Sequence, residues 1–297
     1  MEAQTLTVWR QADRYHIPRI VYLNKMDKNS ADLSASVESV SEKLSTIPLV
    51  IHLPIGAGNK FTGVVDLITM TKYLWNRKDP YDDGKEYYTQ HMNKNKDGDL
   101  YDQAVEARAH LVEQLADVDS AFGDEFLACD DAEKMSPAVV TAALRRAVLS
   151  QQAVAVLCGS SLRNCAVQLL MDAIVQFLPD PVECSLQAYP FVKHYGNSLC
   201  ALAFKTVHDH QRGPLTFVRL YSGSLEVGNS LYNVSRECNE QCGKLYQVFA
   251  DEHREIGVVT AGNIAAVSGL KQVSSFLCVT LIVFSASTTC KSMRNQW

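Results

Sequence analysis

The sequence predicts an α/β fold: a partial doubly wound domain followed by an antiparallel β-barrel domain. Two short apolar runs, at residues 19–23 and 153–157, each end in a loop of polar or small residues, and an amphipathic helix follows the second. Strand, loop and helix in this order are typical of doubly wound sheets, in which ligands bind beyond the carboxyl ends of the strands. After the proline pair Pro179 and Pro181, short apolar runs separated by turns replace the helical periodicity, which favours a barrel.

The first 180 residues alternate between helical and strand patterns. Apolar residues recur at helical spacing across 33–44, and Pro137 suits the first turn of a helix. The expected elements are a helix over 3–15, a strand over 19–23, a helix over 33–44, a strand over 48–51, a hairpin over 58–65, a polar loop-like stretch over 76–100, a helix over about 104–118, a helix from Ser136-Pro137, a strand over 153–157 and a helix over about 167–178.

The remainder of the chain has a strand pattern. Turns such as 212–214 and 227–229 separate short apolar runs, and this spacing favours an antiparallel sheet closed into a barrel. The expected strands are 199–207, 215–221, 230–234, 244–249 and 262–267.

A four-residue motif, Asn24-Lys25-Met26-Asp27, directly follows the first predicted strand. A carboxylate at the end of a buried strand can accept hydrogen bonds from the ring N–H and the exocyclic amine of guanine, whereas adenine has no matching donors on that edge. A site built on such bonds rejects a ligand that lacks them by roughly 10⁴–10⁵-fold. We expect Asp27 to bind the base, the stem of Lys25 to lie over it and Asn24 to fix the loop. A plain turn at the end of a strand is the alternative.

A second loop with the same preference follows the predicted strand 153–157. Cys158-Gly159-Ser160-Ser161 leads through Leu162 towards the next helix. Small residues allow backbone N–H groups to approach a base carbonyl such as O6 of guanine, the other feature that distinguishes guanine from adenine. We therefore expect Ser160, Ser161 and Leu162 to contact the base. Both expectations require the two loops to converge on one purine.

Several segments of the sequence resemble the corresponding segments of the elongation factor G-type translational GTPases. The segments that carry the resemblance are residues 2–12, 17–18, 23–28, 53–56, 159–164, 167–168, 172–173, 178–179, 211–215 and 219–223. Residues 23–28, LNKMDK, match the family's guanine motif, and 159–164 resemble its last guanine motif. The sequences of these segments are most similar to the family's mitochondrial branch that acts in ribosome recycling, and the resemblance covers about residues 1–271.

This resemblance implies a domain order and a function. Residues 1–180 would be the carboxyl-terminal part of a P-loop GTPase domain, with the family's insertion at about 56–150. Residues 185–271 would be its β-barrel domain II, and 272–297 a divergent apolar tail. The implied cofactors are GTP and Mg²⁺, and the implied partners are the mitochondrial ribosome and a ribosome recycling factor in the mitochondrial matrix. Two alternatives stay open: a fragment of the mitochondrial elongation factor G translocase, and a non-catalytic ribosome-binding module.

The phosphate-binding motifs of such a GTPase are missing. The sequence contains no G-x-x-x-x-G-K-[ST] loop and no Asp-x-x-Gly motif, and in the resembled family these elements precede the position of Met1. Phosphoryl transfer depends on a phosphate-cradling loop, its Lys and bound magnesium. We therefore expect the chain to keep guanine recognition, to bind nucleotide weakly and not to hydrolyse it, as a GTPase truncated at both ends.

Composition argues against several other functions. The net charge of −5 does not indicate nucleic-acid binding, although it leaves a ribosome partner open. Nine scattered cysteines are typical of reduced thiols. Cys238 and Cys242 lack the second close pair that zinc needs, and 93–98 lacks the Glu that closes a calcium loop, so we expect a surface turn there and no metal. No targeting segment is recognised, and Ser and Thr residues in 272–290 argue against a membrane span.

Overall fold

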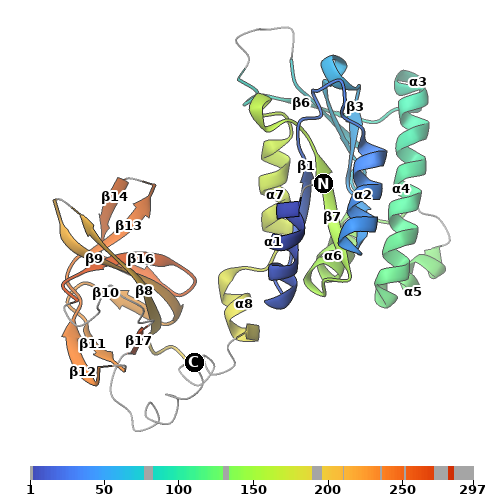
Figure 1. The fold of residues 1–297 in the computed structure, drawn as a ribbon. Coiled ribbons are helices and arrows are strands. Elements are labelled where there is room, and N and C mark those ends of the chain that lie inside the picture. Colours follow the sequence, from blue (N-terminus) through green and yellow to red (C-terminus); the bar gives the residue numbers. More distant parts are fainter. Residues whose placement is uncertain are drawn as a thin grey trace. The chain divides into compact units, whose positions relative to one another are not determined.

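The computed structural model divides the chain into two compact units, residues 1–179 and residues 180–297 (Figure 1). The structure describes residues 3–76, 83–129, 134–188, 196–209, 211–234, 236–250, 252–270 and 280–283. No helix among these residues is both long enough and apolar enough to cross a membrane.

Unit 1 is built around a three-stranded parallel sheet in the order β1-β7-β2. The strands are β1 Ile20–Leu23, β7 Ala153–Cys158 and β2 Ile47–Val50. All six residues of β7 are buried, as expected of a central parallel strand. Leu23 is the register partner of Cys158, so β1 and β7 end level with each other. The loops that follow these two strands therefore start side by side.

Helices cover both faces of this sheet (Figure 1). Val154 and Val156 of β7 point to one face and pack with α1 Ala3–Arg14 and α2 Leu33–Leu44. Ala153, Ala155 and Leu157 alternate to the other face, where they pack with three helices. These helices are α4 Asp99–Val118, α6 Pro137–Leu149 and α7 Val167–Phe177. The predicted parallel sheet with helices is confirmed.

Between β2 and β7 the chain forms an antiparallel sheet and further helices, which we call the excursion (residues 52–149). Its sheet has the order β3-β4-β5-β6, with strands β3 His52–Ile55, β4 Gly63–Asp66, β5 Thr71–Leu74 and β6 Tyr88–His91. The hairpin predicted within 58–65 is wrong in its bounds, because β3 pairs with β4 and Gly58–Lys60 is a single 3-10 turn between them. The helices α3 Lys94–Asp97 and α5 Ser120–Cys129 flank α4. The two helices predicted within the excursion, over about 104–118 and from Ser136, are therefore too few.

The predicted polar loop over 76–100 is also wrong, because β6 and α3 lie within it. All four residues of β6 are exposed, so this edge strand carries no alternation of apolar and polar residues. Instead of a surface turn, 93–98 forms α3, for which Asn93 is the N-cap and accepts a hydrogen bond from the Asn95 amide. Asp97 pairs with Lys72 of β5 at 2.5 Å. Capping and ion pairing thus order a segment that has no hydrophobic periodicity.

Unit 2 is an antiparallel β domain, and this part of the prediction is confirmed. Its strands are β8 Cys200–Asp209, β9 Gly213–Ser222, β10 Ser224–Glu226, β11 Ser230–Asn233, β12 Cys238–Gln241, β13 Leu245–Phe249, β14 Glu252–Ile256, β15 Val258–Thr260, β16 Ile264–Ser268 and β17 Thr280–Val283. Eight of them form one sheet in the order β12-β11-β17-β8-β9-β16-β13-β14, and β10 pairs with β15. Leu231 of β11 and Leu245 of β13 share one core although four strands separate β11 from β13 in the sheet order. The sheet is therefore curved around a common interior.

The strand prediction for unit 2 is incomplete at its shortest and most polar elements. Strands β10, β12, β14 and β15 are three to five residues long, which leaves little periodicity to detect. The proline pair Pro179 and Pro181 was predicted to end a helix and to mark a boundary. Pro181 also begins the unpredicted helix α8 Pro181–Ala188, and the Asp180 carboxylate accepts hydrogen bonds from the Val182 and Glu183 amides. Of the predicted tail 272–297, only 280–283 lies within the described residues, as β17.

A buried histidine makes the stability of unit 1 depend on pH. Burial lowers the pKa of His52 to about 4, and its Nδ1 atom has no hydrogen-bond partner among the described residues. Between about pH 6.5 and pH 4 the unfolded chain therefore binds a proton that the folded chain excludes. The free energy of unfolding should fall as the pH falls through this window, by at most roughly 3 kcal/mol.

This dependence is measurable by urea denaturation at pH 7 and pH 4.5, followed by the fluorescence of Trp9 and Trp75 in a Trp297→Phe background. We expect His52→Phe to flatten the change in unfolding free energy, and the exposed-site control His110→Gln to leave it as in the parent. An equal pH dependence in His52→Phe and the parent would contradict the assignment.

Candidate functional site

The loops after β1 and β7 are joined to each other by backbone hydrogen bonds. The Gly159 amide donates to the Leu23 carbonyl at 3.0 Å, and the Met26 amide donates to the Gly159 carbonyl at 3.1 Å. These bonds continue the parallel pairing beyond the strands themselves. The structure thus brings the predicted residues of both loops together at one edge of the sheet.

Asp27 lies at the base of this site as a buried and oriented carboxylate. Its exposed fraction is only 7%, and Oδ1 accepts a 2.7 Å hydrogen bond from Oγ of Ser160, which is itself buried. A hydrogen bond to a charged acceptor contributes about 1.5–3 kcal/mol. The side chain of Ser160 is therefore a support for the acid, a role that its sequence context alone did not indicate.

Asn24 and Lys25 form the exposed rim of the first loop. Asn24 Oδ1 accepts hydrogen bonds from the Lys25 amide at 2.8 Å and from the Ser161 amide at 2.9 Å, so it ties its own loop to the second one. Lys25 adopts a left-handed backbone conformation with φ of +67°. Its side chain is exposed at the surface of the loop.

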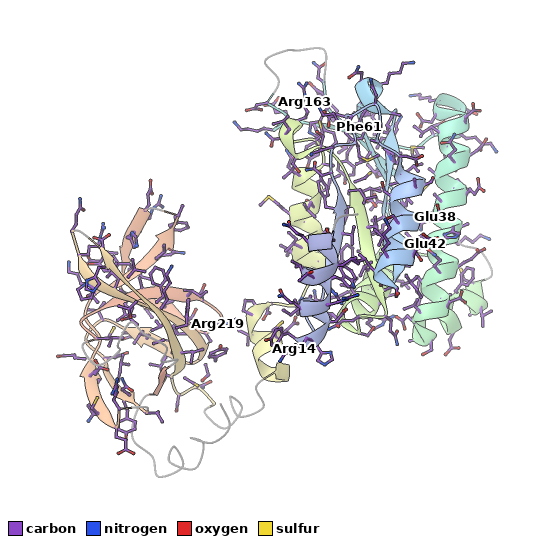
Figure 2. The ribbon with its side chains drawn as sticks, viewed as in Figure 1. Arg14, Glu38, Glu42, Phe61, Arg163 and Arg219 are labelled. Atoms are coloured by element: carbon purple, nitrogen blue, oxygen red, sulfur yellow. The ribbon has the colours of Figure 1, made fainter. Side chains whose placement is uncertain are left out.

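Met26 anchors the motif from below. It is 5% exposed and packs in an apolar cluster with Phe61, Trp75 and Leu169. Figure 2 shows Phe61 at the same end of unit 1 as Arg163 of the second loop. Met26 had no predicted role, and its only signal was an apolar residue inside a polar motif.

The second loop is closed by a pair of backbone hydrogen bonds. The Ser160 and Cys165 amides each donate to the other's carbonyl at 3.0 Å, with the 3-10 turn Ser161–Arg163 between them. Because the Ser160 and Ser161 amides are already used, Leu162 is the predicted contact residue whose N–H makes no hydrogen bond within the described part of the chain. Its side chain is 85% exposed. The three predicted residues therefore differ in what they can offer a ligand.

Gly159 is required here by packing against Tyr22. A Cβ atom at Gly159 would lie 2.2 Å from Tyr22 Oη and 2.5 Å from the Cys165 carbonyl oxygen. Tyr22 Oη donates to that carbonyl at 3.1 Å, and burial raises the pKa of Tyr22 far above its ordinary value, so the hydroxyl keeps its proton. Tyr22 thus holds the closing end of the second loop.

The family resemblance implies a Mg²⁺ ion as a second cofactor beside the nucleotide. Within the described residues, no three His, Cys, Asp or Glu side chains are grouped so that they could hold a metal ion. Burial raises the pKa of Cys158, at the end of β7, to about 12, which keeps this thiol protonated.

Comparison with known protein families identifies both units. Residues 1–180 match the family described as "Elongation factor Tu GTP binding domain", and residues 198–276 match "Elongation factor G domain 2". The chain belongs to the elongation factor G-type translational GTPases. In this family context the loops after β1 and β7 are parts of a GTP-binding domain.

Individual relatives give the same family. The chain is 47% identical to "Ribosome-releasing factor 2, mitochondrial" of Rattus norvegicus and 46% identical to that of Mus musculus, each over 93% of this chain and 35% of the relative. It is 37% identical to "Elongation factor G 2" of Syntrophomonas wolfei, over 93% of this chain and 39% of the relative. The chain thus spans little more than a third of the length of these relatives.

One solved structure supports the fold. A crystal structure of a protein from Thermus thermophilus superimposes with a TM-score of 0.74 at 20% identity, covering 97% of this chain and 39% of that one. At this identity the likeness concerns the fold alone.

Replacing Gly159 by Ala should destabilise unit 1 by roughly 1–3 kcal/mol, because the added methyl group meets a backbone carbonyl and the Tyr22 hydroxyl. Urea denaturation measures this cost, and Gly257→Ala, where the new Cβ meets nothing within 4 Å, is the control. Adding Tyr22→Phe should recover part of the loss. An unchanged unfolding free energy in Gly159→Ala would show that the loops are not packed as described.

Proposed function

We propose that this chain is the guanine-recognising and domain 2 portion of a GTPase that acts on the mitochondrial ribosome during recycling. The observation that carries the proposal is the buried Asp27 carboxylate, held by Ser160 beside the exposed turn of the second loop. In this proposal Asp27 accepts hydrogen bonds from guanine, Lys25 lies over the base, and Asn24, Ser160 and Ser161 hold the two loops together. The Leu162 amide donates to the O6 atom of guanine.

The preference for guanine over adenine follows from the hydrogen-bond donors that each base offers to the Asp27 carboxylate. Guanine places two donors on one edge, so both can reach a single carboxylate. Adenine would shield Asp27 further from water without offering those donors, so it would add desolvation and no new hydrogen bond. Recognition by hydrogen bonds to a buried group is the mode that discriminates most strongly between similar ligands.

Relatives support a role in recycling over translocation. The mammalian proteins matched over 93% of this chain are named ribosome-releasing factor 2 and mitochondrial, which supports the mitochondrial ribosome as the partner. A ribosome recycling factor and the matrix are proposed on the family resemblance. The second candidate is an elongation factor G translocase, favoured by the 37% identity to elongation factor G 2. Both candidates share the proposed base site.

Substituting Asp27 by Asn should abolish the preference for guanine, because the carboxamide presents a donor where the base also has donors. The oxygen of the introduced carboxamide would still accept from Ser160, so the fold should survive. Titration of the ¹⁵N-labelled chain with GDP and with ADP, followed by amide chemical shifts, compares the affinities. We expect GDP to bind more tightly than ADP to the parent and to the exposed-site control Asp124→Asn. Equal affinities for GDP and ADP in the parent would refute guanine recognition.

The 297-residue polypeptide should not accelerate hydrolysis of GTP. Its sequence has no phosphate loop or Asp-x-x-Gly motif, and phosphoryl transfer is mainly positioning and charge stabilisation by those parts. Phosphate release from GTP should match the buffer blank at any protein concentration. Release that rises with protein and disappears in Asp27→Asn would contradict this expectation.

A further inference from the structure

We propose that residues 83–85 of the excursion form a strap that positions the second loop, so that the excursion sets the affinity for guanine. Gly84, Asn164 and Gln168 are the residues through which the strap positions the second loop. The inference rests on the proposed function for its effect on nucleotide binding. The claim that the strap restrains the second loop can be tested without any nucleotide.

Three side-chain hydrogen bonds join the strap to the second loop and to the helix that follows it. Asn164 Nδ2 donates to the Asp83 carbonyl at 2.6 Å. Gln168 Nε2, in the first turn of α7, donates to the Gly84 carbonyl at 3.0 Å and to the Lys85 carbonyl at 3.2 Å. Every acceptor is a backbone carbonyl of the strap, so these side chains respond to the position of the strap's main chain.

The strap is itself fixed to the sheet of the excursion. Trp75, directly after β5, donates from Nε1 to the same Gly84 carbonyl at 3.0 Å. The ring of Tyr87 lies 5.5 Å from that of Trp75 and 5.6 Å from that of Tyr73, centroid to centroid. The Gly84 carbonyl thus joins the excursion's sheet to α7. Displacement of one should move the other.

Gly84 lets the strap approach the second loop at a distance that no other residue permits. Its φ is +73°, and a Cβ atom there would lie 2.1 Å from the Arg163 carbonyl oxygen and 2.9 Å from Asn164 Cβ. Gly98, in the same excursion, also has positive φ but open space around its Cβ position. Replacing each glycine by Ala therefore adds backbone strain in both cases, and pushes against the second loop in only one.

This contact gives the second loop two independent supports. On one side it is held by Tyr22 of β1 and by Asn24 and Asp27 of the loop that follows β1. On the other side it is held by the strap of the excursion. The strap contacts Arg163 and Asn164, directly after Leu162, whose amide is the proposed donor to guanine. A shift of about 1 Å in a positioning group is enough to change ligand recognition strongly.

The test compares Gly84→Ala with the matched control Gly98→Ala in the full chain. GDP and ADP titrations followed by amide chemical shifts give the affinities, and hydrogen exchange of the amides in 160–165 without nucleotide gives the restraint of the loop. We expect Gly84→Ala to bind GDP about tenfold more weakly, the factor for one lost hydrogen bond, and to exchange faster over 160–165. Gly98→Ala should match the parent in both measurements.

A second variant covers the case in which Gly84→Ala does not fold. Asn164→Gly keeps the left-handed backbone at φ of +52° and removes only the donor to Asp83, so it should show the same two effects more weakly. If the parent lacks guanine preference, the proposed function is wrong, while the exchange data still decide whether the strap holds the loop. Unchanged GDP affinity and unchanged exchange in Gly84→Ala or Asn164→Gly would overturn the strap.

Discussion

The site depends on one constraint: the register of β1 and β7, which makes the two parallel strands end at the same edge of the sheet. Leu23 and Cys158 are register partners, and the Gly159 and Met26 backbone bonds extend the pairing by one step on each side. A slip of one residue would turn the side chains of β7 to the opposite faces of the sheet. It would also move Ser160 away from Asp27. Because both faces of the sheet are buried under helices, the helix packing enforces the register that aligns the loops.

Polar residues at the site then act mainly on one another. Ser160 orients Asp27, Asn24 joins the two loops, and Tyr22 holds the carbonyl at the end of the second loop. Such a network fixes the carboxylate before any ligand arrives, which lowers the cost of ordering it on binding. The strap from the excursion adds a support that comes from a different sheet. In the proposed function, base recognition would therefore depend on two substructures of unit 1.

The two loops of the site could be predicted from local sequence patterns. The strands before the two loops are short apolar runs, and Asp27 and Ser160 follow them directly, so their convergence could be expected from the topology of a parallel sheet. The polar sequence 76–100 did not allow β6, α3 or the strap to be predicted. Edge strands, helix caps and close glycine contacts do not require apolar residues at regular spacing. The Asn164 and Gln168 contacts join residues about 80 positions apart. No spacing rule in a single sequence predicts such a pair.

The most direct measurement is a crystal structure of the chain soaked with guanosine 5′-monophosphate, whose base can bind without a phosphate loop. The geometry described here predicts the guanine between the Lys25 stem and the turn at Ser161–Leu162, with its ring N–H and exocyclic amine on the Asp27 carboxylate. A nucleotide bound elsewhere, or a base in this place with its amine turned away from Asp27, would contradict it.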